Sequence, residues 1–402
     1  MLNHHFGFLT LFVFCVCCAP QTQFESAHDA VHNMGIGWNI GNTLESCSHG
    51  QDSLIERTTD RSVMAYETAW GEPQVTRELI HLFSETGFKS IRVPVTWYPH
   101  LDAEDKIDEA WMQRVEEVVN YVLDEGMYCI LNVHHDAGDK NTCWLVADPE
   151  RFDEMNRRFM ALWEQIANRF NKYGERLVFE GWGEMLDKYG AWNCPKDTTA
   201  FDALDRFAYS FVQTVRATGG NNAQRNLMIN TYSASVGGYY MHDGQFGESD
   251  AALQRFHLPE DSVEGHLIAS VHSYIPWNWD QNHALFTDSC EKEIKKTFQK
   301  FDKYILDRGI PLVIGEYGAL FCDGTYPQEG DITTQDKEQG AKYARLMVEE
   351  AIRRDIALLY FMGLIDKEDR TRLEWSRPET VTAITEAFQE VRASSTLTRN
   401  SR

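Results

Sequence analysis

Two glutamates stand where two apolar segments of the sequence end. Glu184 follows the segment Leu177–Gly181, and Glu316 closes the segment Pro311–Glu316, so 132 residues (316 − 184) separate the two carboxylates. If both segments are strands of one small barrel, their ends can aim both side chains into its mouth. Two carboxyl groups about 5–5.5 Å apart are what a retaining glycosidase uses. In that chemistry Glu316 would be the nucleophile and Glu184 the proton donor and base.

More ionisable and aromatic residues stand at the same end of other apolar segments. A lone arginine in a strand usually pairs with a nearby acid, so each of these residues alone has a structural explanation. Counted with the segments of Glu184 and Glu316, five segments carry an ionisable residue at this end, which is harder to explain by packing because buried charges are costly unless paired or used. An arginine next to Glu316 would also keep that carboxylate ionised, as a nucleophile requires. The residues are Arg92, His134, His135, His272 and Tyr274.

The two adjacent histidines could suggest a metal site, but the sequence argues against one. Neighbouring residues of a strand point to opposite faces, so His134 and His135 rarely ligate one ion. No third ligand stands at a helpful spacing, and the cysteines beyond residue 20 form no CxxC pair. We therefore expect neither a metal nor a cofactor.

Eight short apolar runs alternate with longer amphipathic stretches, which is the pattern of a parallel α/β fold. This pattern predicts a single (β/α)8 barrel, with an open doubly wound sheet as the alternative, although no GxGxxG or phosphate loop follows any strand. The connection between the fifth and sixth strands, through Gly237 and Gly238, has no clear pattern. The predicted strands are Met34–Trp38, Ser90–Val95, Met127–Val133, Leu177–Gly181, Asn226–Asn230, Leu267–Ser273, Pro311–Glu316 and Ala357–Met362. The predicted helices are Thr76–Thr86, Ala110–Glu125, Glu150–Phe170, Phe201–Thr218, Glu291–Leu306, Asp336–Arg353 and Thr380–Val391.

Charge and composition narrow the choice of substrate. The formal net charge of the 402-residue chain is -23, which argues against nucleic acid and against a polyanionic substrate. A neutral polysaccharide is compatible with this charge, and the acidity then aids solubility. The chain also has 11 Trp and 16 Tyr, and aromatic rings stack well on the apolar C–H faces of sugars. Core packing explains many of these rings, but their number suits a sugar-binding protein.

The N-terminal region reads as a targeting segment. The apolar run Phe6–Cys18 is too short to span a bilayer and has the length of a signal-peptide core, although no Lys or Arg precedes it. A buried N-terminal strand or helix is the alternative. We expect a signal peptide over residues 1–19, a catalytic domain over 27–393 and a polar tail over 394–402. The protein would then be a secreted or cell-surface monomer without a membrane span, and the cysteines near residue 18 are candidates for lipid attachment.

At these residues the sequence resembles glycoside hydrolase family 5, the large cellulase family of clan A, over nearly the whole mature chain. The resemblance rests on seven segments in the correct order, each weak alone. It implies a (β/α)8 barrel that hydrolyses β-linked glycans with retention and without a cofactor. The segments are Gly37–Glu45, Thr68–Gly71, Gly87–Trp97, Leu131–His135, Phe179–Glu184, His272–Tyr274 and Ile314–Gly318.

The resemblance also assigns roles to individual residues. Glu316 matches the family's nucleophile and Glu184 its acid/base, and neither needs a metal. Arg92, His134, His135, His272 and Tyr274 match groups around the subsite where the bond is cleaved. Candidates for lining the cleft are Trp38, Asn42, Trp97 and Trp277.

Two positions depart from the family pattern. The acid/base normally follows an Asn that contacts the 2-hydroxyl of the sugar undergoing cleavage, and here Gly183 takes that place. Such contacts strengthen in the transition state. The last strand usually ends in a Trp under the same sugar, and here Phe361 would stack less extensively.

The sequence therefore leaves several functions open. The leading hypothesis is an endo-acting β-1,4-glycanase, for cellulose or β-glucan first and then xyloglucan or mannan. The second is an impaired or engineered glycan-binding variant of the same fold, which Gly183 motivates. A (β/α)8 enzyme of other chemistry would need a Schiff-base lysine or a phosphate loop, and Lys89 and Lys188 do not stand at the catalytic end of a strand.

Overall fold

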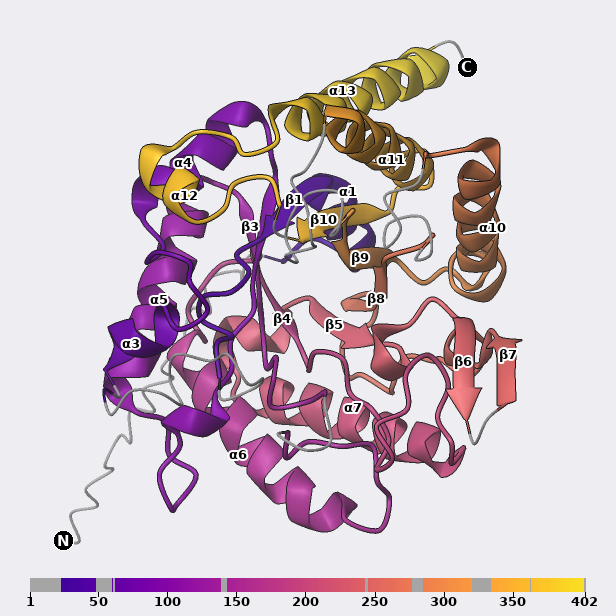
Figure 1. Cartoon of the computed structure of the whole chain (residues 1–402). Coiled ribbons are helices and arrows are strands. Elements are labelled where there is room, and N and C mark those ends of the chain that lie inside the picture. The colour runs from indigo at the N-terminus through magenta and orange to yellow at the C-terminus, as the bar shows by residue number, and fades with distance from the viewer. Residues whose placement is uncertain are drawn as a thin grey trace, which may run out of the picture.

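Eight parallel strands close into a barrel at the centre of the molecule (Figure 1). The computed structural model describes residues 23–47, 60, 62–138, 143–242, 245–276, 285–319, 334–361 and 363–400. Around the barrel the strands follow the order β1-β10-β9-β8-β5-β4-β3-β2, so each pairs with its neighbour in the chain and β1 closes on β10. The barrel strands are β1 Ile36–Asn39, β2 Ser90–Val93, β3 Tyr128–Asn132, β4 Leu177–Glu180, β5 Leu227–Asn230, β8 Leu267–Ser273, β9 Leu312–Tyr317 and β10 Ala357–Phe361.

The closed barrel confirms the predicted (β/α)8 fold, and the open sheet is wrong. All eight predicted strands are present, and their ends move by two residues at most. One shift of two residues lies before β1, where Met34 belongs to a helix and Gly35, at φ 48°, separates the helix from the strand. A positive φ is readily adopted only by glycine, so Gly35 lets the chain turn directly into the barrel.

Helices surround the barrel, and capping residues in the sequence mark where several of them begin or end. Thr76 and Asp108 accept hydrogen bonds from the first turns of α4 and α5, and Gly87 ends α4 in a left-handed conformation. The α-helices are α1 Ala27–Met34, α3 Val63–Glu67, α4 Arg77–Thr86, α5 Glu109–Asp124, α6 Phe152–Arg169, α7 Thr199–Ala217, α8 Ala251–Gln254, α10 Asp288–Tyr304, α11 Thr334–Ile352, α12 Glu368–Arg372 and α13 Pro378–Asn400. The 3-10 helices are η1 Tyr98–His100, η2 Gly220–Ala223, η3 Tyr232–Ala234 and η4 Leu306–Arg308.

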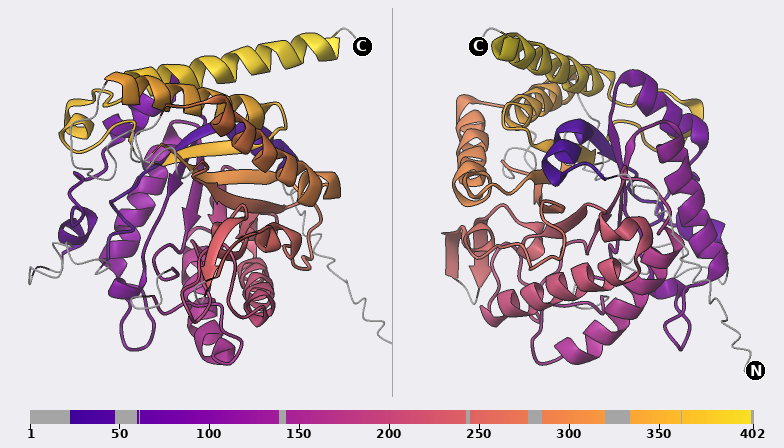
Figure 2. Two further views of the ribbon diagram at one scale, coloured as in Figure 1. Left: turned by 45° about the vertical axis from the view of Figure 1, so that its right-hand side comes forward. Right: turned by 180° about the vertical axis from the view of Figure 1, so that it is seen from behind.

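One helix that the sequence did not predict closes the N-terminal end of the barrel. Helix α1 lies across that end in the view from behind (Figure 2, right), and its backbone is tied to the chain before β8 by Ala27 N donating to Gly265 O at 2.7 Å. The apolar side of α1 packs on the lower interior of the barrel in one cluster. The barrel is therefore a filled core that opens only at its C-terminal end. The cluster contains Ala27, Ala30, Val31, Met34, Tyr128, Ile130, Val178, Met228, Ile268, Val313, Ala357 and Leu359.

The connection between β5 and β8 has its own structure. It contains η3, the antiparallel hairpin β6 Gly238–His242 and β7 Gln245–Ser249, and the four-residue helix α8. The hairpin stands outside the barrel (Figure 2, left). This segment lacks the long helix of the other crossovers, which explains why its sequence showed no helical period.

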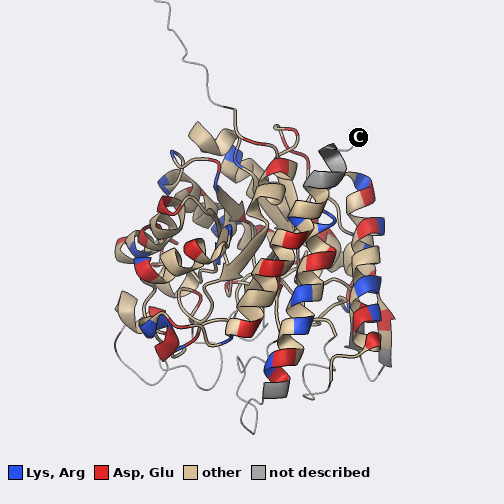
Figure 3. Ribbon diagram, turned by 90° about the horizontal axis from the view of Figure 1, so that it is seen from above, with Lys and Arg blue, Asp and Glu red and all other residues tan. Residues whose placement is uncertain are grey.

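The C-terminal helix is longer than the sequence suggested. Helix α13 packs along α11 and continues to Asn400, so residues 394–400 of the predicted tail are helical (Figure 1). Acidic and basic residues are interspersed over the outer helices (Figure 3). Among the residues that the structure describes, no helix has the length and apolar character needed to cross a membrane. The predicted signal peptide, residues 1–19, lies outside the described residues.

Candidate active site

A layer of polar side chains fills the open end of the barrel interior. Side chains alternate along a strand, so Asn39 faces inward while Trp38 beside it faces outward. Hydrogen bonds across the barrel join the members of this layer into one buried network. The layer consists of Asn39, Arg92, Asn132, Glu180, Asn230, Ser270 and Glu316, one from each of β1, β2, β3, β4, β5, β8 and β9.

Glu316 is the buried carboxylate of the site. Its Oε1 accepts a hydrogen bond from Arg92 Nη1 at 2.7 Å, and its Oε2 accepts one from the Tyr274 hydroxyl at 2.7 Å. His272 Nδ1 lies 3.5 Å from the same Oε2. Burial alone would raise the pKa of this carboxyl, but the charges of His272 and Arg92 and the two hydrogen bonds outweigh it, so the pKa of Glu316 lies below its ordinary value. Glu316 is therefore ionised and held in one orientation.

Glu184 is the more accessible carboxylate of the pair. It lies in the loop after β4, its side chain is 27% exposed, and its Oε1 accepts a hydrogen bond from His272 Nδ1 at 2.8 Å. One oxygen of Glu184, one oxygen of Glu316 and the His272 nitrogen all lie within 4.8 Å of one another. The two carboxylates are thus close enough to act on one bond from two sides.

The imidazole of His272 stands between the two carboxylates. Burial lowers the pKa of a histidine, but the charge of Glu316 and the hydrogen bond to Glu184 outweigh that effect, so the pKa of His272 is raised above its ordinary value. By distance alone His272, Glu184 and Glu316 could also hold a metal ion. These atoms already bind one another and Arg92 and Tyr274 through hydrogen bonds, however, so the contacts fit proton chemistry better.

Sequence reasoning missed Glu180, which is the hub of the polar layer. Its Oε2 accepts from Arg92 Nε at 2.7 Å and from Asn132 Nδ2 at 2.9 Å. Its Oε1 accepts from Asn230 Nδ2 at 3.0 Å and from Ser270 Oγ at 3.2 Å. Donors from four strands therefore fix this carboxylate. The available signal was its place in the sequence, because Glu180 is an acidic residue at the end of an apolar run, as Glu316 is.

The two histidines after β3 face different neighbours. His134 is buried, and burial together with its cationic neighbours holds its pKa well below the ordinary value, so the ring is neutral. Its Nδ1 accepts from Asn132 Nδ2 at 3.1 Å, and its Nε2 lies 4.0 Å from Glu316 Oε1. His135 is more exposed and packs against Trp70, with ring centroids 5.4 Å apart. Trp70, which lies in one of the seven matched segments, is therefore a further aromatic residue of this face.

Gly183 and Phe361 both lie beside the catalytic groups. A Cβ added at Gly183 would meet Nδ1 and the carbonyl oxygen of His134, each at 3.1 Å. The absence of a side chain at Gly183 therefore lets His134 pack closely against the backbone of residue 183. Phe361 ends β10 and packs edge-on against Tyr274, with ring centroids 6.5 Å apart. Tyr274 thus contacts both the Glu316 carboxylate and this aromatic ring.

The structure does not bring two of the predicted cleft residues into the cleft. Trp38 is fully buried and stacks on Phe83 of α4 at 4.3 Å, because it points out of the barrel. Trp97 is also fully buried, and its indole donates to Asn132 O at 2.9 Å. Asn42 follows β1 at the open end and is partly exposed, with a left-handed backbone at φ 59°. Trp277 lies outside the described residues.

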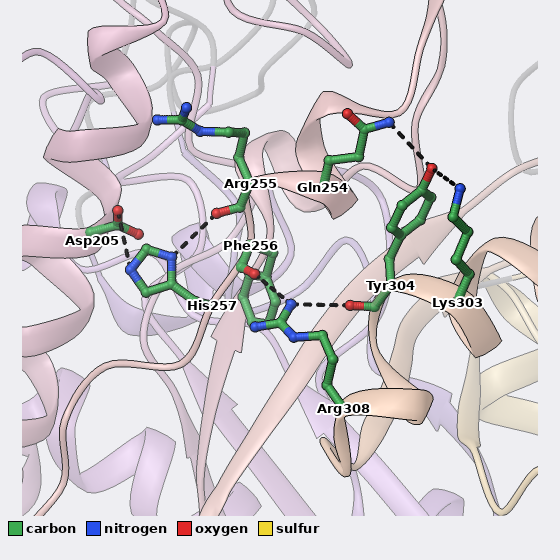
Figure 4. A pocket seen from close by; sticks show the side chains of 8 residues that line it. All are labelled: Asp205, Gln254, Arg255, Phe256, His257, Lys303, Tyr304 and Arg308. Carbon is green, nitrogen blue, oxygen red and sulfur yellow. Dashed lines mark hydrogen bonds and ion pairs between the residues drawn. The ribbon is translucent and has the colours of Figure 1, made fainter.

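A separate pocket lies on the flank of the barrel (Figure 4). Its volume is about 470 Å³, and its side chains are held by bonds such as that from Arg308 Nη1 to Phe256 O at 2.7 Å. It contains none of the strand-end residues described above, so it is not the candidate active site. The pocket is lined by Asp205, Gln254, Arg255, Phe256, His257, Lys303, Tyr304 and Arg308.

Comparison with known proteins assigns a family to this site. The family model for the cellulases, glycosyl hydrolase family 5, matches residues 54–361. Endoglucanase A of Ruminococcus albus is 36% identical over 310 residues, which cover 74% of this chain and 76% of that protein. Endoglucanase B of Neocallimastix patriciarum is 35% identical over 304 residues, 73% of this chain, and the match spans only 58% of its length.

Solved structures agree with these relatives. The family 5 enzyme PbGH5A of Prevotella bryantii superimposes with a TM-score of 0.82 at 38% identity, covering 91% of this chain and 99% of that chain. A variant of that enzyme was solved in complex with a xyloglucan tetradecasaccharide. A broad-specificity endoglucanase from an uncultured bacterium superimposes with a TM-score of 0.79 at 33% identity, covering 91% of this chain and 97% of that chain. The chain therefore belongs to glycosyl hydrolase family 5, the cellulase family, and is a glycoside hydrolase.

Proposed function

We propose that this protein is a retaining, endo-acting β-glycanase that hydrolyses β-1,4-linked polysaccharide. The observation that carries the proposal is the unequal pair of Glu316 and Glu184. Glu316 is buried, ionised and held by Arg92 and Tyr274, whereas Glu184 is partly exposed. A carboxylate oxygen of Glu184 lies within 4.8 Å of one of Glu316. Double displacement needs this inequality, because one carboxylate must attack while the other handles protons.

In this mechanism Glu316 attacks the anomeric carbon, and Glu184 gives a proton to the departing glycosidic oxygen. The C–O bond to the leaving chain breaks as the bond to the Glu316 carboxylate forms. Glu184, now ionised, takes a proton from the water that hydrolyses the glycosyl-enzyme, which restores both groups. Arg92 and Tyr274 hold the attacking carboxylate, so it needs little reorganisation when it reacts.

His272 links the two steps of this reaction. Its Nδ1 is 2.8 Å from Glu184 and 3.5 Å from Glu316, so its charge stabilises each carboxylate while that carboxylate is ionised. His134 is neutral and its Nε2 faces Glu316 at 4.0 Å. It can donate a hydrogen bond near the reacting sugar without adding a positive charge.

The substrate class follows from charge and from the relatives. The chain has a net charge of -23, which suits a neutral glycan. Relatives are named endoglucanases, one structure is called a broad-specificity endoglucanase, and another holds xyloglucan. We propose cellulose or β-glucan as the first substrate, followed by xyloglucan and mannan.

A second candidate function is an impaired glycan-binding protein, and Gly183 is the residue that favours it. The family resemblance implies an Asn there that binds the 2-hydroxyl of the reacting sugar. The backbone of Gly183 is not in the left-handed region, and an added Cβ would crowd His134 only moderately, at 3.1 Å. Gly183→Asn is therefore a feasible test. If turnover is unchanged by this substitution, Gly183 is not a handicap.

The direct test is reducing-sugar release from carboxymethylcellulose, barley β-glucan, xyloglucan and mannan. We expect a fall in viscosity that precedes most of the reducing-sugar release, as internal cleavage requires. Glu316→Gln is the control. Traces that coincide for this variant and the parent protein would exclude the proposed activity.

We further propose that the protein is exported through residues 1–19 and acts as a monomer. The apolar run Phe6–Cys18 supports export. N-terminal sequencing of the protein from the culture medium and light scattering of the purified protein test the two points. An intact N-terminus inside the cell, or a dimer mass, would contradict them.

A further inference from the structure

The loop that continues from Glu184 is built around one buried carboxylate. Asp187 Oδ1 accepts hydrogen bonds from the backbone N–H groups of Tyr189 and Ala191, both at 3.0 Å. Its Oδ2 accepts one from Lys196 N at 2.7 Å. A single side chain therefore folds residues 187–196 into a compact turn, and Asp187 itself is buried.

The short helix η3, which follows β5, supports the same loop from the other side. The Tyr232 hydroxyl accepts from Asp187 N at 3.0 Å and donates to Ala191 O at 2.6 Å. Ser233 Oγ accepts from Asn193 N at 3.2 Å. The backbone on both sides of residue 192 is thus fixed by hydrogen bonds to buried groups.

This well-anchored loop presents two large aromatic side chains to solvent. Trp192 is 50% exposed and Tyr189 is 47% exposed. Rigid loops that expose aromatic rings usually do so for recognition, because exposed apolar area contributes nothing to the stability of the fold. Sugar rings offer C–H faces that match such rings, so a glycan is the ligand with the right chemistry.

We propose that Trp192 and Tyr189 form a platform for the part of the glycan chain that leaves during cleavage. This inference rests on the proposed function. The loop starts at Glu184, which gives its proton to the oxygen on the leaving side of the scissile bond. The sugars beyond that oxygen therefore pass over the segment that follows Glu184, and this segment carries the exposed rings of Trp192 and Tyr189.

The test compares a substrate whose leaving group is a sugar chain with one whose leaving group is a single atom. In cellohexaose the leaving group is a sugar chain, whereas in β-cellobiosyl fluoride it is a single atom that cannot touch the platform. For Trp192→Ala we expect kcat/KM on cellohexaose to fall about tenfold, the loss typical of one aromatic contact. The value for β-cellobiosyl fluoride should stay unchanged. Trp192→Phe should recover most of the loss.

Tyr209→Ala is the matched control, because Tyr209 is also 50% exposed but lies on α7, outside the loop. It should change neither substrate. An equal fall on both substrates for Trp192→Ala, or no fall on either, would overturn the platform. A change of molecular mass by light scattering with unaltered kinetics would identify a contact between two copies instead, and would also overturn it.

Failure of the proposed function gives a different result. In that case the parent protein releases no fluoride and no sugar. Calorimetry with cellohexaose and the Glu316→Gln variant, with and without Trp192→Ala, then measures the platform without turnover. Loss of binding on removal of Trp192 supports the platform, and unchanged binding overturns it.

Discussion

Arg92 and Glu316 form a buried ion pair in which Nη1 and Oε1 lie 2.7 Å apart. The same guanidinium binds Glu180 through Nε, also at 2.7 Å, so one cation serves a structural and a reactive carboxylate. Each buried carboxylate therefore influences the other through Arg92. Because of this coupling, a change at either carboxylate should shift the acidic limb of the pH–rate profile, which reports the ionisation of Glu316.

A substrate that needs no acid catalyst should distinguish the role of Glu184 from that of Glu316. Fluoride leaves without protonation, so Glu184→Gln should keep the burst of fluoride release from β-cellobiosyl fluoride. On polysaccharide the same variant should lose about 100-fold or more, the usual contribution of a general acid. Glu316→Gln should lose both activities. A Glu184→Gln variant without the burst would contradict the assignment.

Tyr274→Phe should move the acidic limb of the kcat/KM profile to higher pH. The Tyr274 hydroxyl helps to lower the pKa of Glu316, and the nucleophile works only when ionised. Hydrogen bonds to charged groups contribute about 1.5–3 kcal/mol, so kcat should fall roughly 10- to 100-fold. Tyr360→Phe is the control, because its hydroxyl accepts from the backbone N–H of Ala319 at 3.2 Å. An unmoved limb for Tyr274→Phe would argue against this role.

Glu180→Gln should move the same limb in the opposite direction. Removing this negative charge leaves Arg92 to Glu316 alone, which lowers the pKa of Glu316 further and shifts the limb to lower pH. Glu67→Gln is a matched control, since Glu67 is buried and paired with Arg114 at 2.7 Å outside the barrel. Both variants should lose stability in urea, by about 1–3 kcal/mol. A limb shift in both would contradict the special role of Glu180.

Stability should fall between pH 5 and pH 7 because of Glu45. Burial raises the pKa of Glu45 to about 7, against an ordinary value of 4.5. The folded state then holds this proton over an interval in which the unfolded chain releases it, so folding is favoured at low pH and loses about 3 kcal/mol as pH rises. Urea unfolding at several pH values measures the slope. Glu45→Gln should flatten it, and an unchanged slope would exclude Glu45 as its source.

The barrel strands were predictable because several of them are continuous Val, Ile and Leu runs, as expected of strands covered on both faces. Helix α1 was missed although Ala27, Ala30, Val31 and Met34 stand at helical spacing, because a helix of eight residues is not stable alone and packing on the barrel end decides its structure. The hairpin β6–β7 was missed although the sequence has Asp243 and Gly244, a pair typical of hairpin turns, between its two strands.

The site was predictable where residues lie at the ends of strands. It was less predictable where the outcome depends on which face of the strand a side chain occupies. Glu184, Glu316, Arg92, His272 and Tyr274 do meet, as their positions suggested. Trp38 was misplaced although the signal existed, because an inward Asn39 forces its neighbour outward. Trp192 could not be found from sequence, since its exposure depends on the turn that Asp187 organises.

Helix α1 also decides how the protein can be attached to a solid support. It covers the end of the barrel opposite the catalytic glutamates, and Ser26 caps its first turn at the surface of that end. A support coupled through a tag placed just before Ser26 would leave the reactive face turned outward. Immobilised in this way, the protein should act on insoluble fibres as readily as it acts in solution, whereas coupling through Lys188 or Lys196, which lie next to the Tyr189 ring, would turn that face toward the support.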